Sequence, residues 1–198
     1  LCMLALKAFG AQNLDFLVPN RFDFGYGLSP QIVDVAADQG ANLIITVDNG
    51  ISCFAGVDRA NASGIEVIIT DHHLAGESLP NASVIVNPNQ PDCHFPSKSL
   101  AGVGVAFYVL SALRQVCNEH DWFERQQIPV PNLANYLDIV ALGTVADVVP
   151  LDHNNRIFVH QGLQRIRSGR CRSGILALLD IAKRNHKRIV ASDMGFAV

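Results

Sequence analysis

The sequence has few of the features that would place it in an oxidising compartment, in a membrane or on a strongly charged partner. Its five cysteines are odd in number, widely spaced and without a CxxC pair, which argues against a disulfide framework and a thiolate zinc site. No apolar run reaches the roughly 18 residues that a membrane span needs. The net charge of −3 indicates no global attraction to nucleic acid or lipid. We therefore expect a cytoplasmic chain with no membrane partner.

Sequence motifs of several other enzyme classes are missing as well. There is no GxxxxGK[ST] loop for a nucleoside triphosphate and no Gly-x-Ser-x-Gly turn for a nucleophilic serine. The cysteines have no activating neighbours. These absences leave carboxylates and imidazoles as the side chains on which any chemistry depends.

Alternating strand and helix patterns fill the first half of the chain. With 198 residues, of which 49% are hydrophobic, the chain can bury a core. Apolar β-branched runs at 43–48 and 65–70 flank a helix expected at about 53–63, which is typical of two parallel strands joined by a crossover. The sequence predicts an α/β fold with an open, mostly parallel sheet, helices on both faces and a helical carboxyl-terminal part. Other expected strands lie at 14–18 and 84–86, and other expected helices at 30–40, 105–118, 133–143, 155–168 and 175–184.

Acidic and imidazole side chains follow the two central strands. Asp48 ends the first strand, and Asp71, His72 and His73 end the second. Because parallel strands end at the same edge of a sheet, where open α/β sheets bind ligands, we expect these side chains to lie close together. Oxygen and imidazole donors without a thiolate favour Mn²⁺ or Mg²⁺. The alternatives are an Asx-turn at Asp48 and purely structural histidines.

A further acid, Asp147, lies in the apolar segment 145–149. A buried carboxylate there would be costly unless it were paired, capped or bound to a metal. Asp152 is better placed than Asp147 to cap the helix that follows. We therefore expect Asp147 to be a buried carboxylate that is paired, capped or bound to a metal.

Two loops rich in small residues are candidate phosphate contacts. The loop at 97–104 leads into a helix amino terminus, where Lys98 and the backbone at Gly102 and Gly104 could bind an anion. Arg21 lies in the other loop. The alternatives are glycines that serve packing alone and an arginine in a surface salt bridge.

Five segments of the sequence, together with Asp48, residues 71–73 and Asp147, resemble the DHH phosphoesterase superfamily. Within that superfamily they resemble the bacterial RecJ family of single-strand-specific 5′ to 3′ DNA exonucleases. The segments are PNRF at 19–22, GYGLSP at 25–30, TVDNGIS at 46–52, FPSKSLAGVGVAF at 95–107 and ALGTVADVVPL at 141–151. The resemblance spans essentially all 198 residues. It implies a metal-dependent phosphodiesterase of DNA repair and recombination, with single-stranded DNA as its partner.

The resemblance also implies roles for individual residues. Asp48, His72 and Asp147 match metal ligands, while Asp71 and His73 match supporting positions. Two Mn²⁺ or Mg²⁺ ions in the intact enzyme would activate a water and stabilise the leaving 3′ oxygen. Residues 1–150 would be a partial DHH core, and residues 151–198 its helical continuation.

The family's first motif, Asp-x-Asp-Ala-Asp-Gly, has no match in the sequence. We therefore expect an internal fragment that lacks an amino-terminal strand and later domains, and that is weak or inactive by itself. One alternative is a DHH oligoribonuclease, cyclic-dinucleotide phosphodiesterase or pyrophosphatase. Another is a catalytically dead DHH-like module that binds a partner. The sequence does not identify protein partners.

Overall fold

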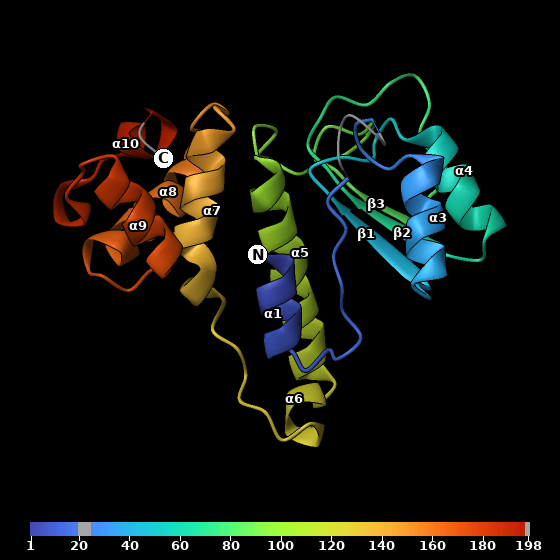
Figure 1. The fold of residues 1–198 in the computed structure, drawn as a ribbon, viewed down its shortest axis with the longest axis horizontal. Coiled ribbons are helices and arrows are strands. Elements are labelled where there is room, and N and C mark those ends of the chain that lie inside the picture. The colour runs from blue at the N-terminus through green and yellow to red at the C-terminus, as the bar shows by residue number, and fades with distance from the viewer. Residues whose placement is uncertain (20–24, 197–198) are drawn as a thin grey trace. The chain divides into compact units, whose positions relative to one another are not determined.

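The chain divides into two compact units. The computed structural model describes residues 1–19 and 25–196. One unit is the continuous segment Leu14–Lys98, here called the sheet unit. The other, the helical unit, combines Leu1–Asn13 with Ser99–Val198 (Figure 1).

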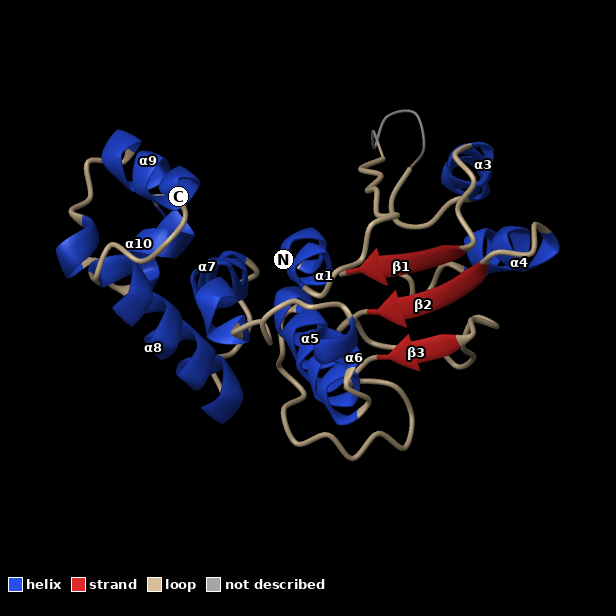
Figure 2. Ribbon diagram, turned by 90° about the horizontal axis from the view of Figure 1, so that it is seen from below, coloured by secondary structure: helices blue, strands red, loops and turns tan. Residues whose placement is uncertain are grey.

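Three parallel strands form the centre of the sheet unit. They are β1 (Leu43–Val47), β2 (Glu66–Thr70) and β3 (Val84–Val86), in the order β1-β2-β3. Figure 2 shows them side by side and pointing the same way. Helix α4 (Phe54–Ala62) is the crossover from β1 to β2. The predicted α/β class with an open parallel sheet is confirmed.

Helices α3 (Pro30–Asp38) and α4 pack against each other and enclose the core of the sheet unit. Helix α3 begins where the sequence predicts, because the Ser29 side chain accepts a hydrogen bond from the Ile32 N–H and Pro30 occupies the first position. Val57 of α4 and Ile69 of β2 are fully buried in this core. The helices thereby hold the strands in place, and with them the carboxyl ends of β1 and β2.

One prediction for the sheet unit is wrong. Residues 14–18 are not a strand, and Phe16 and Val18 are 66% and 81% exposed. Within residues 1–19 and 25–196 no strand pairs with this segment. A short apolar stretch has no ladder hydrogen bonds to stabilise it without such a neighbour.

The helical unit joins the start of the chain to its second half. Its elements are α1 (Cys2–Ala8), α5 (Gly102–Glu119), α6 (Trp122–Arg125), the 3₁₀ helix η1 (Leu133–Tyr136), α7 (Leu137–Ala146), α8 (His153–Arg167), α9 (Ser173–Ile181), the 3₁₀ helix η2 (His186–Arg188) and α10 (Ala191–Phe196). The Trp122 indole donates to the Phe9 carbonyl at 2.7 Å, and the Tyr136 hydroxyl to the Leu4 carbonyl at 3.2 Å. Ala5 and Phe9 pack with Leu110 and Phe123 in one apolar cluster. Helix α1 is therefore fixed by residues more than a hundred positions later in the chain.

Helices α7 and α8 pack closely in the same unit. Asp152 caps α8 by accepting a hydrogen bond from the Asn155 N–H at 3.0 Å, as the sequence predicts. Ala141 of α7 and Ile166 of α8 are fully buried in a shared core. In the described part of the chain, no helix is both long and apolar enough to span a membrane.

Candidate metal centre

A tight turn at the end of β1 presents the Asp48 carboxylate. Asp48 has a φ of 63°, in the left-handed region that Asp tolerates better than most residues. The turn is closed by the Thr46 hydroxyl, which donates to the Asn49 carbonyl, and by the Asn49 amide, which donates to the Val47 carbonyl. These hydrogen bonds, and not an Asx-turn made by the Asp48 side chain, close the turn. The Asp48 carboxylate faces the edge of the sheet.

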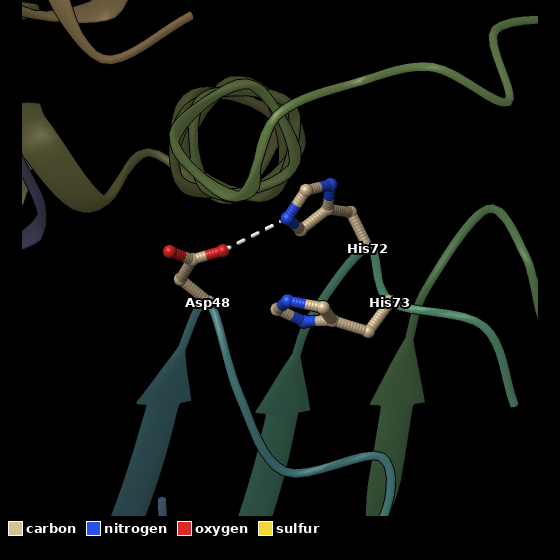
Figure 3. Close-up of side chains that lie close together, drawn as sticks. All are labelled: Asp48, His72 and His73. Atoms are coloured by element: carbon tan, nitrogen blue, oxygen red, sulfur yellow. Dashed lines mark ion pairs between the residues drawn. The ribbon is translucent and has the colours of Figure 1, made fainter. Parts of the chain in front are cut away.

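The end of β2 brings two imidazoles to the same edge. Nε2 of His72 lies 3.0 Å from an Asp48 carboxylate oxygen. The His72 and His73 rings have centroids 4.6 Å apart. One donor atom from each of Asp48, His72 and His73 lies within 4.8 Å of the others (Figure 3). The predicted approach of these side chains is what the structure shows.

The three side chains differ in exposure. His72 is 13% exposed, whereas Asp48 and His73 are 54% and 49% exposed. A small ligand can therefore reach the cluster from solvent. The donor set of one carboxylate and two imidazoles, without a thiolate, fits Mn²⁺ and, through the carboxylate, Mg²⁺.

Asp71 is a buried carboxylate that holds this edge together. It is 1% exposed. One oxygen accepts hydrogen bonds from the N–H groups of His72 and His73, at 2.7 and 3.2 Å, and from Nδ1 of His73 at 2.7 Å. The other accepts from the Ile51 N–H at 2.9 Å, in the turn that follows Asp48. A single side chain thus links the two turns that carry the cluster.

These hydrogen bonds also set the charge of Asp71. Burial by itself would raise the pKa of the carboxyl group. The hydrogen bonds from Ile51, His73 and His72 outweigh burial and hold the pKa below its ordinary value of 3.8. Asp71 is therefore ionised at neutral pH, and its charge orients the His73 ring through Nδ1.

Two asparagines after β3 complete the support of the histidines, and the sequence analysis missed them. The Asn87 amide donates to the His73 carbonyl at 2.9 Å, and the Asn89 amide donates to the His72 carbonyl at 2.6 Å. Asn87 is 2% exposed. The available signal was their place at the end of a third parallel strand, the same edge of the sheet that carries Asp48 and Asp71.

Asp147 belongs to the helical unit, and the prediction that it is buried is wrong. It is the exposed C-cap of α7, and its N–H donates to the Gly143 carbonyl. The apolar run ends at the surface because the chain turns there, with Val148 at a φ of 57° and 85% exposed. A role for Asp147 as a metal ligand stays a prediction.

Lys98 closes a loop of the sheet unit. Its ammonium group donates to the carbonyls of Pro88 and Cys93, at 2.6 and 2.5 Å. Its own carbonyl accepts a hydrogen bond from the Asn89 amide at 3.1 Å. Lys98 thus contacts the same asparagine that supports His72, while its expected contact with phosphate stays a prediction.

The remaining candidates for phosphate contact lie elsewhere. Gly102 and Gly104 are buried in the first turn of α5, and the Gly104 N–H donates to the Ala101 carbonyl at 2.8 Å. Arg21 lies outside the described residues. Their contacts with phosphate also stay predictions.

Comparison with known proteins identifies relatives of this chain. A family model described as "DHH family, N-terminal domain" matches residues 1–144. The single-stranded-DNA-specific exonuclease RecJ of Escherichia coli (strain K12) is 60% identical over 198 residues, which cover all of this chain and 34% of the relative. The chain thus spans about a third of the length of that curated relative.

Solved structures agree with these matches. A crystal structure of exonuclease RecJ bound to manganese matches with a TM-score of 0.78 and 32% identity, over 99% of this chain and 46% of the other. RecJ from Thermus thermophilus, in complex with Mn²⁺, matches with a TM-score of 0.72 and 32% identity, over 99% of this chain and 26% of the other. The resemblance found in the sequence is confirmed: this chain belongs to the DHH family.

Proposed function

We propose that this chain is part of a metal-dependent phosphodiesterase that degrades single-stranded DNA from its 5′ end. The observation that carries the proposal is the Asp48 carboxylate 3.0 Å from His72 Nε2 at the carboxyl edge of a parallel sheet. The relative in Escherichia coli is named a single-stranded-DNA-specific exonuclease. That name favours a long DNA strand over the smaller substrates of other DHH enzymes, and a catalytic role over binding alone.

Asp48, His72 and Asp147 are the proposed ligands of Mn²⁺ or Mg²⁺, with two ions in the intact enzyme. RecJ structures that contain manganese support the choice of ion. Bound there, the ions supply a water activated for attack on phosphorus and positive charge beside the leaving 3′ oxygen. Asp48 and His72 contribute a negative oxygen and a neutral nitrogen on neighbouring strand ends, which suits a shared cation.

His73 has a supporting role in this proposal. Its Nδ1 is held by the buried Asp71 carboxylate at 2.7 Å. In the neutral ring the proton therefore lies on Nδ1, and Nε2 keeps its lone pair. Asp71 orients the ring, while Asn87 and Asn89 fix the backbone of both histidines.

Contacts with the phosphates of the strand are assigned to Arg21, Lys98, Gly102 and Gly104. Lys98 would exchange its bonds to two backbone carbonyls for a phosphate oxygen. Residues 1–150 form part of the DHH core in this proposal, and 151–198 continue it. With such a role in DNA repair and recombination, the proposed location is the cytoplasm.

Metal binding by this chain is the first test. The perturbation is Asp48→Asn, because Asn tolerates the left-handed backbone and removes only the charge. We expect Mn²⁺ titration, followed by electron paramagnetic resonance, to show at least tenfold weaker binding. Asp34→Asn is the matched control, since Asp34 is an exposed acid of the same unit that pairs with Arg59. Equal Mn²⁺ affinity in Asp48→Asn and the unmodified chain would contradict the assignment.

Hydrolysis is the second test, and it uses the full-length protein. We expect release of mononucleotides from the 5′ end of single-stranded DNA in Mn²⁺, with duplex DNA left intact. Asp48→Asn and Asp147→Ala should each abolish the release. An active Asp147→Ala enzyme would remove Asp147 from the ligand set. Strong release by the 198 residues alone would contradict the prediction that they are weak or inactive.

A further inference from the structure

Arginines gather at an open hollow of the helical unit, where α8 ends and α9 begins. The hollow has a volume of about 430 Å³ and is lined by Asn135, Arg165, Arg170, Cys171 and Arg172. Arg165 lies in the last turn of α8, and Arg172 is the N-cap of α9. Figure 1 shows α8 and α9 in the orange and red part of the chain.

One of the three guanidinium groups is neutralised. Asp138 is fully buried, and one of its oxygens pairs with Arg172 Nη1 while the other accepts the Arg172 N–H at 2.8 Å. Arg172 Nη1 also donates to the Asn135 carbonyl at 2.6 Å, and its guanidinium lies 5.1 Å from the centre of the Tyr136 ring. These contacts hold the Arg172 side chain in place, and its charge is balanced by Asp138.

The other two guanidinium groups are held by neutral acceptors. Arg165 Nη2 donates to the Asn135 side-chain oxygen at 2.8 Å, and Arg170 Nε donates to the Ser168 hydroxyl at 3.1 Å. Neither of them contacts a carboxylate in the described residues. The Arg165 Nε is buried without a hydrogen-bond partner there.

The charge at this hollow has the opposite sign to that of the chain. Three guanidinium groups against the single Asp138 carboxylate leave a local charge of about +2, whereas the chain carries −3. Neutral acceptors orient Arg165 and Arg170 without cancelling their charge. Their remaining N–H groups can bind an external anion, and guanidinium matches phosphate oxygens geometrically.

A stabilised helix end is the simpler explanation for part of this arrangement. Cations near the carboxyl end of α8 interact favourably with its dipole, which accounts for Arg165. It does not account for Arg170, which lies beyond the helix. A cation at this helix end need not line the hollow. Arg167 lies in the same last turn, but it donates to the Ile189 carbonyl at 2.9 and 2.6 Å and is not part of the lining.

We propose that the hollow binds backbone phosphates of a single-stranded nucleic acid through Arg165 and Arg170. The choice of a strand over free inorganic phosphate rests on the proposed function. The hollow itself needs no metal. Its occupation by DNA can therefore be measured separately from hydrolysis.

The test is binding of a fluorescent oligothymidylate in EDTA, followed by anisotropy at several salt concentrations. Each phosphate contact contributes about 0.7 to the slope of log K against log salt for single strands. The double variant R165Q/R170Q should therefore flatten the slope by about 1.4, which corresponds to about 25-fold weaker binding at about 0.1 M salt. R165K/R170K should keep the slope, because lysine keeps the charge.

Arg125→Gln is the matched control, an exposed arginine of the same unit that does not line the hollow. Unchanged far-ultraviolet circular dichroism confirms that each variant is folded. An R165Q/R170Q slope equal to that of Arg125→Gln would overturn the proposal. Complete displacement of the oligonucleotide by millimolar inorganic phosphate, at matched ionic strength, would also overturn it. If the unmodified full-length protein bound the oligonucleotide with this salt dependence but did not hydrolyse it, the result would count against the proposed function and not against the hollow.

Discussion

Replacing Asp71 by Asn tests whether one buried carboxylate holds together the two turns of the candidate metal centre. The substitution keeps the shape of the side chain and changes one oxygen to an amide N–H₂ group. Asp71 accepts four hydrogen bonds, three on one oxygen and one on the other. In the better orientation Asn keeps the oxygen that faces the histidines. Its amide group then faces the Ile51 N–H, donor against donor.

The cost follows from these four bonds. A buried donor left without an acceptor costs about 1–3 kcal/mol. Hydrogen bonds to a charged group contribute about 1.5–3 kcal/mol, compared with about 0.5–1.5 for neutral pairs, so the three remaining bonds also weaken. We expect Asp71→Asn to lower the free energy of unfolding by about 4 kcal/mol, a large part of the roughly 5–15 kcal/mol of a domain.

The loss of stability in Asp71→Asn should depend on pH, and the direction follows from the pKa of Asp71. The pKa of Asp71 is lower in the folded than in the unfolded chain, so the ionised form favours folding. Its contribution is complete above the unfolded pKa, near 4, and is lost as the pH falls through the folded pKa. The stability difference between the unmodified chain and Asp71→Asn should therefore be full at pH 7 and shrink below about pH 4.

Urea unfolding of the sheet unit, followed by circular dichroism at pH 7 and at lower pH, measures this difference. Asp34→Asn is the control, because it makes the same change at an exposed pair with Arg59 and should cost no more than about 1 kcal/mol. If Asp71→Asn costs no more than Asp34→Asn, the reasoning fails. A difference that does not change with pH would show that the charge of Asp71 is not the cause.

Three further substitutions test close packing and a buried ion pair inside the two units. Gly50→Ala should cost about 3 kcal/mol in urea unfolding, because Gly50 has a φ of 120° and a Cβ there would lie 2.9 Å from Ile69 Cγ2. Gly162→Ala would place a Cβ 2.3 Å from the Leu137 carbonyl oxygen and should lower the melting temperature of the helical unit, corresponding to about 2–3 kcal/mol. Asp138→Ala leaves the Arg172 guanidinium without its carboxylate and should cost about 3 kcal/mol. This value is near the low end for a buried pair because Arg172 is 29% exposed. An unchanged melting curve would contradict this prediction.

The three paired strands and the approach of Asp48, His72 and His73 could be predicted from the sequence because both depend on local pattern. Apolar runs ending in Asp48 and in Asp71 require only that parallel strands share an edge. The cap at Ser29 was equally local, since Ser followed by Pro is typical of a helix start. These signals lie within a few neighbouring residues of the chain.

The features that were missed depend on contacts between distant segments. Asn87 and Asn89 act through carbonyls of His72 and His73, and no spacing in the sequence reveals which carbonyls lack a partner. Asp147 was expected to be buried because its neighbours are apolar, but burial depends on where the chain turns, and Val148 turns it outward. A strand at 14–18 would likewise have required a neighbouring strand.

The insertion of the sheet unit between the two parts of the helical unit has a consequence for synthesis on the ribosome. The sheet unit is continuous, so its core can form once Lys98 has left the exit tunnel. Helix α1 is made before the sheet unit, whereas its packing partner Phe123 and the indole that binds the Phe9 carbonyl are made after it. The contacts of α1 with Phe123 and with the Trp122 indole can therefore form only after the whole sheet unit has been synthesised.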